Sequence, residues 1–256
     1  MTGSTQNQTA FHARWTEDRT TPQALRSHLA GVSRRSQAFA EILKLTDWSF
    51  VVAARLAGLL HDLGKYRVVF QNYLNVGDRG RRSNETAHAI YGAAAALKNW
   101  DSLAAAFAIA GHHAGLHDQD QLAAQLSSQK FQALDRFPDL LSQANESREL
   151  AGVLERLKPK NEDASDSLAR LDYDENNPAD VRRFDVFVRM LFSILVDADR
   201  IDSEKFEQEH RRQRTWERPI RTLDAAALLA RLDEARRAKG SQKKDCLLYT
   251  SDAADE

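Results

Sequence analysis

Apolar side chains recur at intervals of three and four residues along most of the chain, which is the spacing of amphipathic helices. Thr21-Pro22 reads as a helix start, because proline is tolerated in the first turn of a helix. The apolar positions that follow it at helical spacing are Leu25, Leu29, Val32, Phe39 and Ile42. A second helix is predicted from about Ser49 into the stretch HDLGK (61–65), where Gly64 is typical of a helix C-terminus.

The rest of the chain continues the helical pattern. Helices are predicted through TAHAIYGAAAALKNW (86–100) and through DSLAAAFAIAGHH (101–113). Residues 119–160 predict two or three more amphipathic helices, and the acidic stretch 161–180 predicts an irregular loop or short helices. A strongly apolar helix, VRRFDVFVRMLFSILVDADRID (181–202), is expected to close the core. Few segments alternate apolar and polar residues with a period of two, so no sheet is expected and the fold class is all-α.

Ionisable side chains lie inside these apolar segments or directly at their ends. They are His28, His61-Asp62, His88, His112-His113, Asp197 and Asp199. A lone histidine near an apolar face is usually a hydrogen-bonded core residue, but burying this many ionisable groups without partners would cost several kcal/mol each. They would satisfy one another if they surrounded divalent cations. A set in which histidine predominates suits Mn, Fe, Co, Ni or Zn better than Ca.

The pair His112-His113 is the most unusual feature of the sequence. Consecutive side chains on a helix point about 100° apart, so they do not normally share one target. Gly111 and Gly115 flank the pair, which allows the helix to end there and both imidazoles to face the same point. The alternative is an ordinary polar helix terminus.

Composition restricts the classes of protein that need consideration. The chain has 256 residues, of which 42% are hydrophobic and 29% charged, as expected of a globular protein with a sizeable core. It has no apolar run of about 18 residues, so no membrane span is expected. The single cysteine, Cys246, excludes an internal disulfide and favours a reducing cytoplasm. The formal net charge is −1, so any binding of nucleic acid would depend on local basic segments.

The polar positions, in this order, resemble the HD superfamily of metal-dependent phosphohydrolases, and more narrowly the HD nuclease of type I CRISPR interference. The likeness is carried by LRSHLAGV (25–32), LAGLLHDLGKYRVVFQNYL (56–74), ETAHAIYGAA (85–94), IAGHHAGLHD (109–118) and LVDADRIDSE (195–204). The dipeptide HD alone is a weak signal, whereas HDLGK followed by AGHHAGLHD and DADRIDSE is specific. The likeness extends from about residue 11 to about residue 205.

The resemblance implies a helical bundle that holds two divalent ions (Mn, Fe, Co, Ni or Mg). One ion would be bound by His28, His61, Asp62 and Asp199, and the other by Asp62, His88, His112 and His113. Asp197 competes with Asp199 for the last position, and Asp199 is favoured because it aligns with the family's Ala-Asp pair. The ions would activate a water for attack on phosphorus. Asp62 and Lys65 would be catalytic, with Lys65 as an electrostatic stabiliser; a solvated lysine is the alternative.

Basic segments would bring DNA to such a site. Three arginines follow the segment that contains HDLGK, namely Arg79, Arg81 and Arg82. The stretch 210–221 contains five arginines around Trp216. Arginine interleaved with an aromatic side chain suits single strands, because it combines phosphate neutralisation with base stacking. Solvated faces are the alternative. No GxxxxGK[ST] loop occurs in these residues, so they are not expected to form an ATP-driven motor. The family resemblance implies a superfamily 2 helicase, in cis or in trans, and a CRISPR surveillance complex as partners.

The domain organisation follows from this likeness. We expect an HD nuclease domain in residues 1–222, a helical extension or connector in 223–245, and a disordered tail in 246–256. The tail resembles the translation of a sequencing-library adapter, and an ordinary disordered terminus is the alternative. The expected function is cleavage of single-stranded DNA in antiviral defence. An HD phosphohydrolase acting on nucleotides or cyclic dinucleotides, and a non-catalytic scaffold, are the competing hypotheses.

Overall fold

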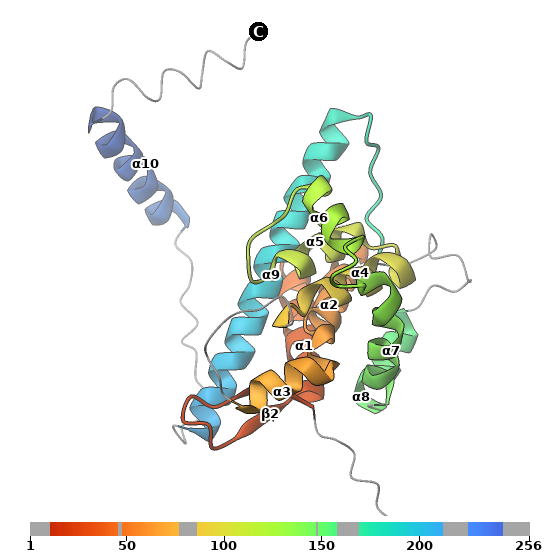
Figure 1. Cartoon of the computed structure of the whole chain (residues 1–256). Coiled ribbons are helices and arrows are strands. Elements are labelled where there is room, and N and C mark those ends of the chain that lie inside the picture. The colour runs from red at the N-terminus through yellow and green to blue at the C-terminus, as the bar shows by residue number, and fades with distance from the viewer. Residues whose placement is uncertain are drawn as a thin grey trace, which may run out of the picture. The chain divides into compact units, whose positions relative to one another are not determined.

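The computed structural model describes residues 11–45, 48–76, 86–146, 148–157, 169–211 and 225–242. The all-α prediction is confirmed, because regular structure in these residues is helical apart from one short hairpin (Figure 1). The elements are β1 (His12–Trp15), β2 (Pro22–Ala24), α1 (Leu25–Ile42), α2 (Trp48–Leu60), the 3-10 helix η1 (Leu63–Tyr66), α3 (Val68–Val76), α4 (Ala89–Trp100), α5 (Leu103–Gly111), α6 (Gln119–Leu126), α7 (Ala133–Asn145), α8 (Arg148–Leu157), α9 (Pro178–His210) and α10 (Ala225–Gln242). The chain divides into two compact units, Met1–Trp216 and Glu217–Glu256, and α10 belongs to the second.

Helix α2 lies at the centre of the first unit, in contact with α1, α4, α5 and α9. Its sequence, WSFVVAARLAGLL, is apolar around almost its whole circumference, and a helix of this kind is stable only when neighbours surround it. Helix α5, LAAAFAIAG, has the same character and packs against α4 and α9. The two helices therefore deliver the residues at their C-terminal ends, His61-Asp62 and His112-His113, to the interior of the bundle.

Helix α9 is the long apolar helix that the sequence predicts, and it extends further in both directions than expected. Its N-terminus is set by Asn177, whose side chain accepts a hydrogen bond from the Ala179 amide, and by Pro178 in the first turn. The helix has 33 residues and packs against α1, α2 and α5. It therefore carries Asp199 along the core to the ends of these helices.

The hairpin β1–β2 corrects two predictions. Pro22 lies in β2, and α1 begins three residues later at Leu25, so the predicted helix start at Thr21-Pro22 is wrong. Proline is compatible with an edge strand, because such a strand can lack one hydrogen-bond donor. The turn is closed by Asp18, whose carboxylate accepts hydrogen bonds from the hydroxyls of Thr16 and Thr20 at 2.7 and 2.8 Å. The prediction that the chain contains no sheet is also wrong, because β1 and β2 form a two-stranded sheet. Strands this short show no detectable alternation of apolar and polar residues.

Other boundaries differ more modestly. Helix α2 ends at Leu60 instead of running into HDLGK, and neither η1 nor α3 was predicted. Helices α6, α7 and α8 lie in the region where two or three helices were expected. Among the helices that the structure describes, none combines the length and the apolar character that a membrane crossing requires.

Several predictions fall outside the described residues. They concern Arg79, Arg81 and Arg82, most of the basic stretch 210–221, the expected domain boundary after residue 222, and the tail 246–256.

Candidate metal centre

The stretch HDLGK forms the bend between α2 and α3. His61 and Asp62 lie in the turn after Leu60, and both side chains are buried. Gly64 lies within η1 and does not have the left-handed backbone of a helix stop, which was its predicted role. A Cβ atom on Gly64 would lie 2.4 Å from the carbonyl oxygen of His88. The glycine is therefore needed because two backbone segments approach each other closely at this point.

A first group of ligand atoms comes from α1, the bend and α9: His28, His61 and Asp199. His28 Nε2 lies 3.2 Å from Asp199 Oδ1 and 3.3 Å from His61 Nε2. Both imidazoles are buried, with 2% and 0% of the residue exposed, respectively. Asp197, the competing carboxylate, is exposed and does not belong to this group, so the structure places Asp199 there.

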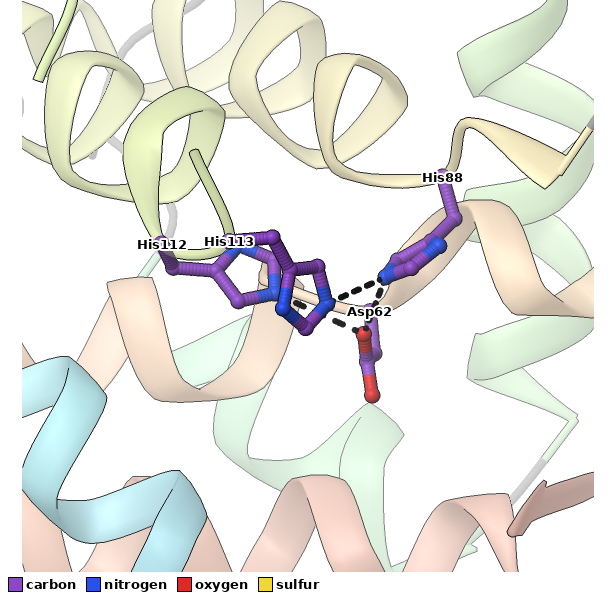
Figure 2. A group of neighbouring side chains, drawn as sticks. All are labelled: Asp62, His88, His112 and His113. Carbon is purple, nitrogen blue, oxygen red and sulfur yellow. Dashed lines mark hydrogen bonds and ion pairs between the residues drawn. The ribbon is translucent and has the colours of Figure 1, made fainter. Parts of the chain in front are cut away.

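A second group consists of Asp62, His88, His112 and His113, whose ligand atoms all lie within 4.8 Å of one another (Figure 2). His88 immediately precedes α4, and His112 immediately follows α5. Because α5 ends at Gly111, the two consecutive imidazoles turn to the same side, with ring centroids 3.9 Å apart. His88 Nε2 lies 2.9 Å from His113 Nε2. This convergence is the arrangement that the flanking glycines suggested.

The carboxylate of Asp62 connects the two groups. Its Oδ2 lies 3.3 Å from both His28 Nε2 and His61 Nε2. Its Oδ1 lies 3.0 Å from His88 Nε2 and 3.8 Å from His112 Nε2. Each oxygen therefore faces one group, so Asp62 can act as a bridging ligand between two sites.

Hydrogen bonds fix the orientation of four of these imidazoles. In each ring Nδ1 lies 2.7–3.0 Å from an oxygen that can only accept a hydrogen bond, so Nδ1 carries a proton and Nε2 points into the site. The pairs are His28 with Asp202, His61 with the Gly58 carbonyl, His88 with the Thr86 carbonyl and His112 with the Ile109 carbonyl. A metal-binding histidine shows this arrangement, with one nitrogen held by an acceptor and the other free to coordinate.

The nitrogen and oxygen atoms of the two groups are arranged better for coordinating a divalent cation than for hydrogen bonding to one another. Metal binding requires both rings to be neutral, and in that state the lone pairs of His28 Nε2 and His61 Nε2 lie 3.3 Å apart and are both available to an ion. Among the described residues, Asp62 Oδ1 and His112 Nε2 are buried and have no well-aligned hydrogen-bond partner. Such orphaned polar atoms are costly without a ligand. The residues therefore fit the metals expected for a mixed imidazole and carboxylate site.

The charges in the centre reinforce this conclusion. Burial alone would raise the pKa of Asp62, but the Lys65 ammonium, 2.6 Å away, and the surrounding imidazoles hold it well below its usual range. Burial would lower the pKa of His28, but hydrogen bonds with Asp199, Asp202 and Asp62 raise it to about 10. Without a metal, a proton on His28 thus provides the positive charge that these carboxylates require.

The second group contains a neutral histidine at its outer edge. Partial desolvation of the ring by the protein atoms around it, together with the neighbouring imidazoles of His112 and His88, lowers the pKa of His113 to about 3. His113 nevertheless reaches the protein surface, whereas His28 and His61 of the first group are buried. The second group therefore offers unprotonated nitrogens on the side of the centre that reaches solvent.

Two residues of the surrounding network were not predicted from the sequence. Asp202 contacts His28 Nδ1, and Gln23 donates a hydrogen bond to Asp202 at 2.8 Å. Asp202 lies in the stretch DADRIDSE (197–204), three residues after Asp199 and therefore on the same face of α9. That spacing could have identified it, whereas nothing in the sequence around Gln23 marks it.

The comparisons with known proteins agree with this geometry. The HD domain matches residues 25–168, which is more than half of the chain. The matched range contains every histidine of the two groups together with Asp62, and Asp199 follows it on α9. No curated protein matches the chain. The HD domain is the helical fold of metal-dependent phosphohydrolases, and this chain belongs to the HD domain family.

Proposed function

We propose that the chain is a metal-dependent nuclease that cleaves single-stranded DNA in type I CRISPR antiviral defence. It would act in the cytoplasm with a superfamily 2 helicase, in cis or in trans, and with a CRISPR surveillance complex. The observation that carries the proposal is the position of Asp62, whose two oxygens each face a separate group of imidazole nitrogens. A centre for two cations that share a carboxylate is typical of enzymes that hydrolyse phosphate esters.

Each group would hold one ion together with one oxygen of Asp62. The first would use His28, His61 and Asp199, and the second would use His88, His112 and His113. When bound, two divalent cations supply a water of lowered pKa and positive charge at the phosphate oxygens. Because His113 is exposed and the imidazoles of the first group are buried, the phosphodiester would approach the centre from the side of the second group.

Lys65 adds a fixed positive charge beside this centre. Its ammonium lies 2.6 Å from Asp62 Oδ2 and also donates a hydrogen bond to the Ala13 carbonyl at 3.2 Å. Both contacts hold the charge at the edge of the carboxylate that the two groups share. We assign Lys65 the role of an electrostatic stabiliser of the negative charge that develops on the phosphate.

Support for a nuclease, as opposed to a phosphohydrolase of small substrates, comes from the sequence. The combination of the motifs HDLGK, AGHHAGLHD and DADRIDSE resembles the CRISPR nuclease family, although consecutive histidines also occur in other HD enzymes. Two arginine-rich segments, 78–84 and 210–221, would contact the strand. The balanced net charge of −1 suggests weak binding of DNA by this chain alone, as expected of a nuclease that receives its strand from a helicase.

The proposal is tested with purified protein, stripped of metal and then supplied with Mn²⁺ or Ni²⁺. We expect it to degrade circular single-stranded DNA, which has no ends, and we expect His61→Ala and Asp62→Ala to abolish this cleavage. Asp197→Asn, a change at an exposed carboxylate on α9, is the matched control and should cut like the wild type. Survival of the circle while nucleotides or cyclic dinucleotides are hydrolysed would favour the small-substrate enzyme. Absence of bound metal and of any hydrolysis would favour a scaffold.

A further inference from the structure

The carboxylate of Asp202 belongs to neither group of candidate ligands, yet it is buried against the first one. It lies one helical turn after Asp199 on α9, with 8% of the residue exposed. Its Oδ2 lies 2.9 Å from Nδ1 of His28, on the opposite side of the ring from Asp199 and Asp62. Gln23, from β2, donates a hydrogen bond to the same oxygen at 2.8 Å.

The chain provides space for this carboxylate at Gly31. Gly31 lies three residues after His28 on α1, so the two positions share a face of the helix. A Cβ atom on Gly31 would lie only 2.2 Å from Asp202 Oδ1. Any side chain at this position would therefore displace the Asp202 carboxylate from its present position.

His28 differs in this respect from the other oriented imidazoles. The Nδ1 atoms of the other three contact backbone carbonyls two or three residues earlier in the chain; these are His61, His88 and His112. Their orientation is therefore set locally, by the turn that carries each of them. The orientation of His28 depends on a charged group from a different helix, because Asp202 reaches it from α9.

We propose that Asp202 is a positioning residue. It holds the His28 ring with Nε2 directed at the first metal site and makes Nε2 more basic, so that this nitrogen binds the metal more tightly. Gln23 orients the carboxylate, and Gly31 leaves room for it. The inference rests on the metal centre of the proposed function, but not on DNA as the substrate. A carboxylate hydrogen-bonded to a metal-binding histidine has this effect in other proteins, where its removal weakens metal affinity by about 10–100-fold.

The test is a calorimetric titration of the metal-free protein with Mn²⁺. We expect two sites in the wild type, and we expect Asp202→Asn to weaken one of them by about 10–100-fold while the other keeps its affinity. Gly31→Ala should weaken the same site, because it displaces the carboxylate without removing it. The displaced atoms are the end of a flexible side chain, so this variant should fold even if Asp202→Asn does not. Asp197→Asn is the control on the same helix.

A spectroscopic measurement separates positioning from a general loosening of the fold. In the Zn²⁺-loaded protein, the Nδ1 proton of His28, assigned by its loss in His28→Gln, should shift upfield in Asp202→Asn and remain in place in Asp197→Asn. The proposal is overturned if Asp202→Asn and Gly31→Ala bind Mn²⁺ like the wild type, or if both sites weaken equally. Cleavage of DNA does not enter this test, so a protein that binds metal but cuts no DNA would refute the proposed nuclease and leave this inference intact.

Discussion

Substitution of Gly64 by alanine tests how the bend positions the second group. The new Cβ would lie 2.4 Å from the carbonyl oxygen of His88 and 2.6 Å from its Cα. Both are backbone atoms, so η1 or the start of α4 must move by about 0.6 Å to restore a tolerable contact of about 3.0 Å. Metal–ligand distances vary by only about 0.2 Å, so a shift of this size at His88 should weaken the second site.

We expect Gly64→Ala to lower the free energy of unfolding in EDTA by about 1–3 kcal/mol, the usual cost of overpacking a core. It should also weaken one of the two Mn²⁺ sites and spare the one that contains His28. Urea unfolding followed by circular dichroism, and calorimetric titration, measure the two effects. Gly152→Ala is the control: nothing lies within 4 Å of its Cβ position in α8, so it should stabilise the protein by about 1 kcal/mol. A Gly64→Ala protein with unchanged stability and two unchanged sites would refute this reasoning.

Three further predictions follow from the centre. Asp62→Asn should weaken both Mn²⁺ sites, whereas Asp199→Asn should weaken only one, as measured by calorimetric titration. If the two variants lose the same number of sites, Asp62 does not bridge the two groups. Mn²⁺ at about 100 times its dissociation constant should stabilise the protein by about 2.7 kcal/mol per site, measured by urea unfolding against an EDTA control. Without metal, the raised pKa of His28 should contribute stability that is fully present below pH 6.5 and lost as the pH rises to about 10. His28→Gln should flatten this dependence, and an unchanged slope would contradict it.

Much of the fold could be predicted because its core helices are marked by strong local patterns. The apolar runs of α2 and α5 are rich in alanine and leucine, which favour helices, and the apolar positions of α9 continue through a helix of 33 residues. The hairpin was missed because its strands have four and three residues, and because Pro22 is equally compatible with a helix start and an edge strand. Local patterns do not distinguish these cases, since the pairing of β1 with β2 is a tertiary contact.

The candidate ligands could be predicted because they are ionisable residues inside apolar segments or at their ends, but the choice between neighbouring carboxylates depends on tertiary structure. The family resemblance favours Asp199 over Asp197, but helical spacing alone allows either carboxylate, and the rotation of α9 decides which one faces His28. Asp202 was missed because its partner, His28, lies 174 residues away in the chain. The role of Gly64 was misread for a similar reason, since its neighbour His88 belongs to another segment.

The central claim is that Asp62 bridges two metal ions, and anomalous diffraction tests it most directly. Crystals grown with Mn²⁺ should give two anomalous peaks, one on the His28 side of Asp62 and one on the His88 side, about 3.5–4 Å apart. A single peak, or peaks that do not flank the Asp62 carboxylate, would contradict the account.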